Sequence, residues 1–573
     1  MNFEITADNS PYLKARGKIV LNACPGSGKT TAVAYKLTTL IEECEKKYGK
    51  YSGIACLSFT NVAKDEIGKK YEEIKGISLG YPNIISTIDS FINQYITLPF
   101  YHMLSVPSKR PSILNTVEFL NDMHLGWFPN IKGQPLKVSY PPSRLKIEID
   151  GTYTWDGNKC NPKVADIAVF ERYAKAFKDW QINNGFINND DSTYLACKLL
   201  ETYPQIAQYL VERFPYIIID EAQDTSEIQY KIFDILISAG LSNIEFVGDP
   251  YQSLYEFREA RPDMFLNRFN DAAQWQAIRF SDCRRSSQNI IDMYSLFRNA
   301  AEKAIISTCK HGTDHQVKVI RYDENDPTSL IEQYQKLVDS DSSNYILVRG
   351  GTHLEKFGIK PPSEEPWKNS LAKMLINAQH HYDKGNTKSS IDDLRVFFVE
   401  ICFSGSDYNA KKEEIKKLKE DVNFNIRLFE FLKGMPKIDD TLKNWTVNIT
   451  TYVKAHFGID IDLQLKQKGA VFYALNLKEL LFPEITTPFP ISTIHKIKGM
   501  TFTTILLVLS HNSSGQNISL TDFVRPASLP SEKQRMLYVA LSRPEVSCFI
   551  AVPNVISEKQ IIAQLGNTIE FIN

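Results

Sequence analysis

The chain has 573 residues, of which 43% are hydrophobic and 23% charged, and this balance predicts several globular domains rather than a disordered or fibrous protein. The formal net charge of −1 provides no overall basic field, although a neutral protein can still carry a basic groove for nucleic acid. The nine scattered cysteines contain no C-x-x-C pair, which argues against a zinc or iron–sulfur site. Neither a basic leader nor an apolar run of roughly 18 residues is evident, so we expect a cytoplasmic protein without a membrane partner.

The first hundred residues alternate short apolar strands with amphipathic helices. Apolar runs at 18–24, 53–58 and 83–87 predict three strands, and the apolar spacing between these runs predicts helices. This alternation is typical of a parallel sheet covered by helices. We therefore expect residues 1–97 to form the first part of an α/β core.

Two interruptions divide the rest of the chain. The expected segments are a mainly helical insertion at 98–205, the second part of the first core at 206–275, the first part of a second core at 276–351, a second mainly helical insertion at 352–485, and the second part of the second core at 486–573. Further strands are predicted at 216–220, 243–248, 316–321, 345–348, 490–494 and 504–509. The predicted fold class is α/β, with two parallel-sheet cores that are each interrupted by a helical insertion.

A phosphate-binding loop is predicted at 23–30, where the sequence ACPGSGKT follows a strand and opens a helix. Glycines let backbone N–H groups approach a β-phosphate, the lysine reaches the β- and γ-phosphates, and the Thr30 hydroxyl can bind Mg²⁺. The flanking strand and helix disfavour the alternative of a chance match. The expected nucleotide-binding residues are Ala23, Cys24, Pro25, Gly26, Ser27, Gly28, Lys29, Thr30 and Thr31, with ATP and Mg²⁺ as cofactors.

Two adjacent acids end the predicted strand at 216–220 in the sequence DEAQD. Asp220 is expected to hold Mg²⁺, and Glu221 is expected to orient and deprotonate the attacking water. Alone, such a segment is better explained as an acidic turn that caps the helix beginning near Thr225. The phosphate-binding loop upstream on the same sheet favours the catalytic interpretation.

These segments and others resemble, in order and spacing, the motifs of the UvrD/Rep family of superfamily-one DNA helicases. The matching segments are the phosphate-binding loop, 57–61 with Ala63 and Glu66, 86–91, 185–191, the DEAQD segment, 247–258, 283–290, 493–499 and 532–543. The resemblance covers both cores and implies that they are RecA-like. Among relatives, the compact chain resembles the helicase subunit of Gabija-type anti-phage systems, which works with a separate nuclease.

The resemblance also implies roles for residues around the phosphates. Gln252 would sense the γ-phosphate, while Arg285 and Arg543 from the second core would place guanidinium charge on it, as arginine fingers do. For either arginine, the alternative is a surface or interdomain salt bridge.

For DNA, Phe59 and Phe257 occupy positions at which the family stacks aromatic rings on bases. The candidate phosphate or base contacts are Thr60, Asn61, Thr87, Arg258 and His495. An ordinary core position is the alternative for either phenylalanine.

Three departures from the family concern the nucleotide base and sugar. The N-terminal glutamine that reads adenine is missing, with Asn9 as a weak substitute. Arg284 replaces the tyrosine that stacks on adenine, although a guanidinium can also stack on a purine. Thr501 replaces an acid that contacts the ribose. Together these changes favour a looser base preference and leave the phosphate chemistry untouched.

The function implied by the resemblance is Mg²⁺-dependent ATP hydrolysis coupled to 3′–5′ movement on single-stranded DNA. Single-stranded and tailed duplex DNA are the expected partners, with a separate nuclease subunit as a further one, in DNA repair or antiviral defence. The alternative is a nucleotide-gated DNA-binding or regulatory subunit that does not unwind alone.

Overall fold

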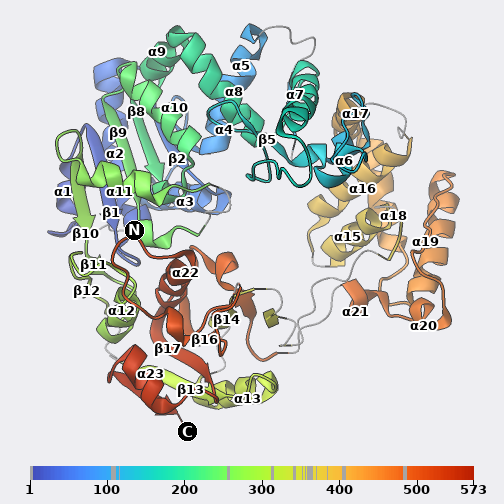
Figure 1. The fold of residues 1–573 in the computed structure, drawn as a ribbon. Coiled ribbons are helices and arrows are strands. Elements are labelled where there is room, and N and C mark those ends of the chain that lie inside the picture. Colours follow the sequence, from blue (N-terminus) through green and yellow to red (C-terminus); the bar gives the residue numbers. More distant parts are fainter. Residues whose placement is uncertain are drawn as a thin grey trace. The chain divides into compact units, whose positions relative to one another are not determined.

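The computed structural model describes residues 4–104, 111–114, 117–254, 259–310, 315–339, 343–350, 353–354, 357, 366–368, 371–383, 385–402, 408–481, 487–515 and 517–572. The chain forms two compact units, of which the first consists of Met1–Gly350 with Phe489–Asn573 and the second of Gly351–Pro488. Two six-stranded parallel sheets, the RecA-like cores, lie in the first unit (Figure 1). The fold class predicted from the sequence is confirmed.

The first sheet has the strand order β10-β1-β9-β8-β2-β3, and all its neighbouring strands are parallel. Its strands are β1 (Lys18–Ala23), β2 (Ile54–Ser58), β3 (Ile84–Thr87), β8 (Tyr216–Asp220), β9 (Asn243–Gly248) and β10 (Gln276–Phe280). The phosphate-binding loop follows β1, and the DEAQD segment follows β8, two positions away in the sheet. Both loops therefore leave the carboxyl edge of one sheet, where ligands of α/β proteins bind.

The strand β10 corrects one expectation. We expected residue 276 to open the second core, but Gln276–Phe280 pairs with β1 from Ile19 to Ala23 and completes the first sheet. In sequence, a short apolar strand after a helix has the same pattern whether it extends the previous sheet or starts a new one. Hydrogen-bond pairing across more than 250 residues decides between the two, and no local pattern reports it.

Alternate side chains of the first sheet supply two hydrophobic layers. Helices α2 (Lys29–Tyr48) and α3 (Asn61–Lys75) cover one face, where Leu37 and Ile67 pack with Ile19, Ile54 and Val247. The other face is covered by helices that include α8 (Asn189–Thr202), α9 (Pro204–Arg213), α10 (Glu227–Ser238) and α11 (Pro262–Asn270). Apolar side chains on both faces explain why these strands read as nearly continuous apolar runs.

The first insertion is mainly helical but contains short strands. Its helices are α5 (Leu98–Phe100), α6 (Leu136–Ser139), α7 (Ile167–Asn183) and α8, and its strands are β4 (Ser112–Ile113), β5 (Leu145–Ile147), β6 (Tyr153–Trp155) and β7 (Phe186–Ile187). The strands β5 and β6 form an antiparallel hairpin. In α8, Leu199 and Leu200 pack into the first core, so this end of the insertion is anchored to the sheet.

The second sheet has the strand order β15-β14-β16-β17-β13-β18 and is also parallel. Its strands are β13 (Val317–Tyr322), β14 (Asn344–Val348), β15 (Ile491–Thr493), β16 (Phe502–Val508), β17 (Pro544–Pro553) and β18 (Ile569–Ile572). Before it lies a small pair, β11 (Asp282–Cys283) with β12 (Ile306–Ser307). Helix α13 (Pro327–Leu337) packs on the sheet through Tyr334, whose ring centroid lies 5.4 Å from that of Phe549.

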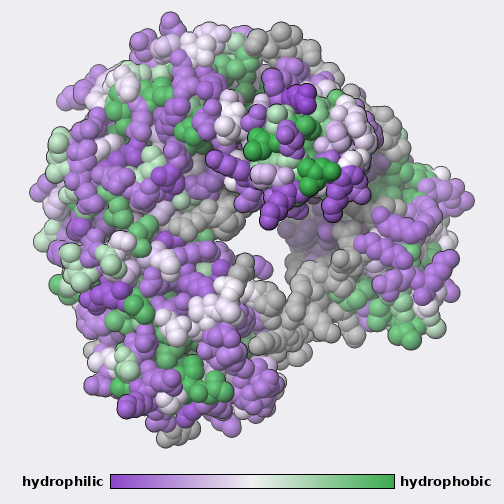
Figure 2. Space-filling model, in the orientation of Figure 1, coloured by the Kyte–Doolittle hydropathy of each residue, from purple (hydrophilic) through white to green (hydrophobic). Residues whose placement is uncertain are grey.

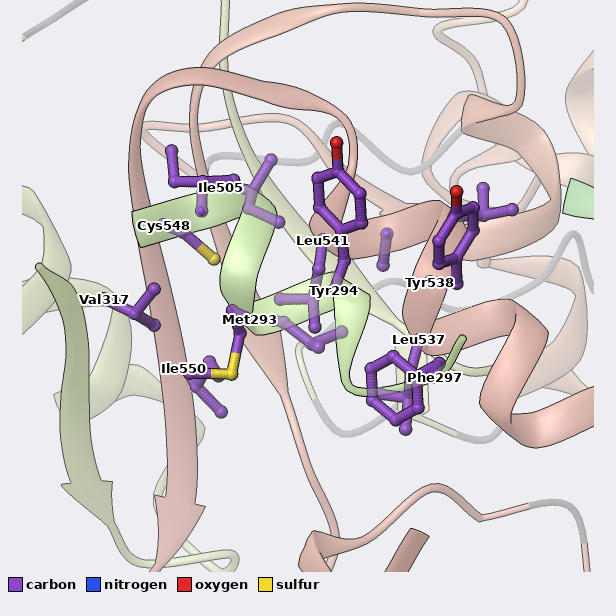
Figure 3. Packing of buried hydrophobic residues seen from close by; sticks show 14 of the residues in the cluster. Met293, Tyr294, Phe297, Val317, Ile505, Leu537, Tyr538, Leu541, Cys548 and Ile550 are labelled. Carbon is purple, nitrogen blue, oxygen red and sulfur yellow. The ribbon is translucent and has the colours of Figure 1, made fainter. Parts of the chain in front are cut away.

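A second hydrophobic core joins α12 (Gln288–Ser295) and α22 (Glu532–Leu541) to this sheet. Figure 3 shows Met293 and Tyr294 of α12 packed among Leu537 and Tyr538 of α22 and residues of β16 and β17. The Tyr294 and Tyr538 rings meet edge to face with centroids 5.2 Å apart. Packing on this scale fixes α22, from which Arg535 and Tyr538 reach the first core. Helix α23 (Glu558–Leu565) adds Ile561 and Leu565 to the same layer.

In its described residues the second compact unit consists of helices joined by loops, with two isolated β-bridges. It contains α15 (Leu371–Asp383), α16 (Thr387–Cys402), α17 (Tyr408–Glu420), α18 (Val422–Gly434), α19 (Leu442–Phe457), α20 (Ala470–Tyr473) and α21 (Leu477–Leu481). Its own core includes Trp367 and Trp445, whose ring centroids lie 5.5 Å apart. Its limits lie close to those of the insertion expected at 352–485.

On the face seen in Figure 2, most of the described surface is hydrophilic, with hydrophobic residues scattered among polar ones. Among the described residues, no helix has the length and apolar character needed to cross a membrane. The same part of the chain contains no group of three or more His, Cys, Asp or Glu side chains that could hold a metal ion by themselves.

Candidate active site

The phosphate-binding loop has two glycines in left-handed backbone conformations. Gly26 has φ +72° and Gly28 has φ +81°, and α2 begins directly after Gly28, at Lys29. The Gly26 carbonyl accepts a hydrogen bond from the Arg284 backbone N–H at 2.9 Å. A Cβ atom at Gly26 would lie 2.6 Å from the Cβ of Arg285. Glycine is required here both for its backbone conformation and for the close approach of the segment after β10.

One cleft of about 390 Å³ joins this loop to residues of both cores. Its lining comprises residues 23–31 of the phosphate-binding loop, Thr60, Val62, Ala63, Glu66, Glu221, Asp224, Gln252, Arg285, His495, Lys496, Lys498, Gly499 and Arg543. The structure therefore brings most of the residues singled out from the sequence to one cavity. Asp220 lies beside the cleft, fully buried and in contact with Lys29.

Lys29 binds the two acids that follow β8. Its Nζ lies 3.3 Å from Asp220 Oδ1 and forms an ion pair with Glu221 Oε1. Burial lowers the pKa of Lys29, but the two carboxylates outweigh it and raise the pKa above its ordinary value. The lysine is therefore charged in this arrangement. Its partners here are the two carboxylates, and a bound phosphate would compete with them for its Nζ.

The two acids respond differently to burial. Burial raises the pKa of Asp220 above its ordinary value despite Lys29. For Glu221 burial also raises the pKa, but the cations of Lys29 and Lys498 lower it further, so the net pKa falls. Glu221 has a left-handed φ of +55° and accepts a hydrogen bond from Gln223 Nε2 at 2.6 Å. The site thus holds Glu221 ionised and oriented, and the neighbouring Lys29 and Lys498 lower its basicity in this arrangement.

Asp220 and Thr30 form a plausible donor set for a hard divalent cation. Asp220 is buried, and its Oδ1 lies 3.3 Å from Lys29 Nζ, the cation that a bound metal would replace. Thr30 lines the adjacent cleft. A carboxylate and a hydroxyl beside a phosphate site are ligands that Mg²⁺ accepts, with the remaining positions filled by substrate oxygens and water. The residues present therefore fit the expected metal.

Sequence reasoning missed a second cation. Lys498 of the second core forms an ion pair with Asp224 of the first, and its Nζ also lies 3.9 Å from Glu221 Oε2. Burial raises the pKa of Asp224 to about 6, although Lys498 opposes the shift. Lys498 lies in the segment 493–499, which resembles a family motif, but the sequence assigned it no role. Its partner could be found only from the three-dimensional structure.

Arg543 and Gln252 meet where the two cores face each other. Arg543 Nη2 donates to Gln252 Oε1 at 2.7 Å, and Gln252 Nε2 donates to Asp249 Oδ2 at 2.8 Å. Arg543 Nε donates to the Val539 carbonyl at 3.0 Å. Burial, together with the neighbouring charge of Arg285, lowers the pKa of Arg543 to about 9. Arg543 therefore contacts the first core through Gln252 and also lines the cleft.

Helix α22 makes two further contacts with the first core that were not predicted. Tyr538 Oη donates to Asp249 Oδ2 at 3.1 Å, and the buried Arg535 donates through Nε to the Ser253 carbonyl at 2.8 Å. The second predicted arginine, Arg285, donates through Nη1 to the Ser542 carbonyl at 3.0 Å and lines the cleft. The segment 249–253 is thus held from the second core at several atoms.

The predicted DNA contacts fall into four groups. Thr60 and His495 line the cleft, and Thr60 also caps α3 by accepting a hydrogen bond from the Ala63 N–H. Thr87 caps the short helix α4 (Ile88–Ile92) in the same way through Ser90. Phe59 is half-buried and Asn61 is exposed. Phe257 and Arg258 lie outside the described residues. The contacts with DNA remain predictions.

Three positions where the sequence departs from the family motifs have the following surroundings, and their effect on base preference stays a prediction. The Asn9 side chain is buried, accepts from the Thr6 N–H at 2.9 Å and donates to the Glu4 carbonyl at 3.0 Å, so both ends of its amide serve its own loop. Arg284 is half-buried and Thr501 exposed. Burial lowers the pKa of the His495 imidazole and so favours its neutral form.

Residues 6–273 match the family model described as the UvrD/REP helicase N-terminal domain. Among curated proteins, the chain is 23% identical over 436 residues to the ATP-dependent DNA helicase PcrA of Staphylococcus epidermidis (strain ATCC 35984), covering 69% of this chain and 53% of that protein. It is 22% identical over 442 residues to PcrA of Staphylococcus aureus (strain Mu50), covering 72% and 55%. The chain thus spans about half the length of these relatives.

Proposed function

We propose that this chain is a UvrD/Rep-like helicase, which hydrolyses ATP with Mg²⁺ and couples hydrolysis to 3′–5′ movement along single-stranded DNA; the match of residues 6–273 to the UvrD/REP helicase N-terminal domain and the likeness to PcrA support this proposal. Unwinding of tailed duplex DNA follows from the same activity. A separate nuclease subunit is the partner class that we propose for it. The relatives PcrA are named as ATP-dependent DNA helicases, and their names support this proposal.

The observation that carries the proposal is a single cleft that is lined by cations from both cores and by a carboxylate of the first core. The first core contributes Lys29 and Glu221, and the second contributes Arg285 and Arg543. A triphosphate needs cations on both sides, because negative charge spreads over its γ-oxygens during transfer. A base must also stand beside the water, and among the carboxylates that line the cleft we propose Glu221, which lies beside Lys29 of the phosphate-binding loop.

Each residue has a role that follows from its contacts. Glu221 would accept the proton of the attacking water while the hydrogen bond from Gln223 fixes its orientation. Lys29 would exchange its carboxylate partners for phosphate oxygens, which frees Glu221 to act as the base. Asp220 and Thr30 would hold Mg²⁺, which supplies positive charge to the phosphate oxygens. Arg285 and Arg543 would add guanidinium charge from the opposite core.

Coupling to movement follows from the position of Gln252. This side chain touches Asp249 of its own core and Arg543 of the other. A ligand that draws Arg543 toward a γ-phosphate therefore also disturbs the segment 249–253, which precedes the residues expected to meet DNA. The cores would close on ATP and reopen after hydrolysis.

The test is phosphate release by purified protein with Mg²⁺ and ATP, with and without single-stranded DNA. We expect strong stimulation by DNA and a loss of roughly 10²–10⁴-fold in Glu221→Gln, the range for a general base, with ATP binding retained. Wild-type hydrolysis by Glu221→Gln would refute the assigned mechanism.

Polarity and unwinding require a second assay with duplexes that carry a single-stranded tail at either end. We expect activity on the 3′-tailed duplex and none on the 5′-tailed one. Hydrolysis that is indifferent to DNA, with no unwinding of either duplex, would favour a nucleotide-gated regulatory subunit instead.

A further inference from the structure

Glu259 has an unusual backbone conformation directly after the segment 247–258. Its φ is +64°, in the left-handed region that glycine occupies freely and other residues rarely adopt. Such a conformation persists in a glutamate only where surrounding contacts hold it, and strained residues of this kind gather at functional segments. Glu259 is held by contacts of its side chain and of the backbone that follows it.

The Glu259 side chain is held by the first insertion. Lys146 of β5 donates from Nζ to Glu259 Oε1 at 2.5 Å, and the same Nζ lies 3.7 Å from Asp190 Oδ2 in the first turn of α8. A Cβ built on Gly157, just after β6, would lie 4.0 Å from Glu259 Oε1. The hairpin β5–β6 and the start of α8 thus converge on one carboxylate.

The backbone after Glu259 is fastened to the loop that carries the catalytic acids. Ala260 is buried and forms an antiparallel bridge with Ser226. The Arg261 N–H donates to the Thr225 carbonyl at 3.1 Å, and the Thr225 N–H donates to the Ala222 carbonyl at 3.2 Å. Ala222 directly follows Glu221. A continuous set of contacts therefore runs from the hairpin, through Glu259, to the residue beside the proposed base.

We propose that Glu259 is a positioning residue through which the β5–β6 hairpin of the first insertion sets the response of ATP hydrolysis to DNA. The proposal rests on the proposed function, because it concerns the stimulation of that hydrolysis by DNA. The Lys146–Glu259 ion pair holds Glu259 in its left-handed conformation and so constrains the backbone after it, which is bound to the loop of the catalytic acids. Neither side chain lines the active-site cleft, so neither touches the phosphates or the attacking water, and we expect hydrolysis without DNA to persist in their variants.

The test compares full-length variants in steady-state phosphate release, without DNA and at saturating single-stranded DNA. Lys146→Met and Glu259→Gln each remove one charge, and Glu259→Gly also removes the carboxylate but suits the left-handed backbone. The charge-exchanged variant, Lys146→Glu with Glu259→Lys, restores the pair, and it also carries Asp190→Asn so that the new glutamate faces no like charge. Lys175→Met serves as the matched control, because it breaks an exposed ion pair with Asp179 elsewhere in the same insertion.

We expect the three single variants to lose DNA-stimulated kcat by about two- to fivefold, the range that a partly exposed ion pair can command. Hydrolysis without DNA and the KM for ATP should stay at wild-type values, and the charge-exchanged variant should recover stimulation. A merely structural role would not predict that recovery. Lys175→Met should match the wild type.

Several outcomes would overturn the proposal. Wild-type stimulation in Lys146→Met and Glu259→Gln, or in Glu259→Gly, would show that the carboxylate tether has no role. Failure of the charge-exchanged variant to recover would show that the pair itself does not transmit the effect. If the wild-type protein hydrolyses ATP but no DNA stimulates it, the proposed function fails together with this proposal, whereas wild-type stimulation with unaffected variants refutes the tether alone.

Discussion

Alanine at Gly26 and alanine at Gly28 make a matched pair of perturbations in the phosphate-binding loop. Both glycines have left-handed backbones, with φ +72° and +81°, so alanine at either position costs about 1–2 kcal/mol in backbone strain. At Gly28 the new Cβ meets no described atom within 4 Å. At Gly26 it would lie 2.6 Å from the Arg285 Cβ and 3.0 Å from the Cys283 Sγ, which adds an overpacking penalty of about 1–3 kcal/mol.

We therefore expect Gly28→Ala to destabilise the protein by about 1–2 kcal/mol, and Gly26→Ala by about 2–5 kcal/mol, the sum of strain and overpacking. The assay is urea unfolding without nucleotide, followed by fluorescence, so that loss of phosphate binding does not enter the comparison. The difference between the variants isolates the contact of the loop with the segment after β10. Equal destabilisation of the two would refute the reasoning, because it would mean that this contact yields without cost.

The remaining predictions concern charge and base recognition. Arg543→Lys should lower kcat by about 10³–10⁵-fold, as loss of an arginine finger does, with the ATP Kd from equilibrium binding nearly unchanged; a KM effect alone would contradict the role. Burial raises the pKa of Asp224 to about 6 from 3.8, so the folded state binds this proton more tightly than the unfolded chain does. The contribution of Asp224 to the stability of the folded protein therefore falls as the pH rises between these values. Asp224→Asn should consequently gain in Tm relative to the wild type from pH 4 to pH 7, and a constant difference would count against it. Because the Asn9 amide is engaged within its own loop, kcat/KM for ATP should exceed that for GTP by less than about tenfold (1.4 kcal/mol), and Arg284→Tyr should raise the ratio; a wild-type ratio of a hundred would show that adenine is read elsewhere.

The sequence predicted those features that depend on residues close together in the chain. The strand that ends at Ala23, the helix that begins after Gly28 and the acids that follow β8 each have a local signal, namely an apolar run followed by the residue types that phosphate chemistry needs. The order of the motifs then implied two cores, and the two parallel sheets agree with it.

Features that depend on distant pairs could not be predicted in the same way. The edge strand Gln276–Phe280 joined the first sheet because its backbone pairs with β1, and its sequence is equally suited to the start of a new core. Likewise, the ion pair of Lys498 with Asp224 joins residues 274 positions apart. The left-handed conformation of Glu259 had no signal at all, because glutamate is not a residue that turn chemistry favours there.

The strand order also explains how this architecture tolerates large additions. The second unit leaves the chain after β14 and returns before β15, and these two strands are parallel neighbours at one edge of their sheet. Two parallel strands always require a crossover of a dozen or more residues, so the connection existed before anything was built upon it. The first insertion likewise follows β3, the edge strand of its own sheet. Both additions therefore begin at a sheet margin, where they interrupt no ladder of hydrogen bonds, whereas β1 and β8, which precede the phosphate-binding loop and the catalytic acids, are interior strands. Shortening the second unit to a crossover of about a dozen residues is thus the deletion that this topology allows.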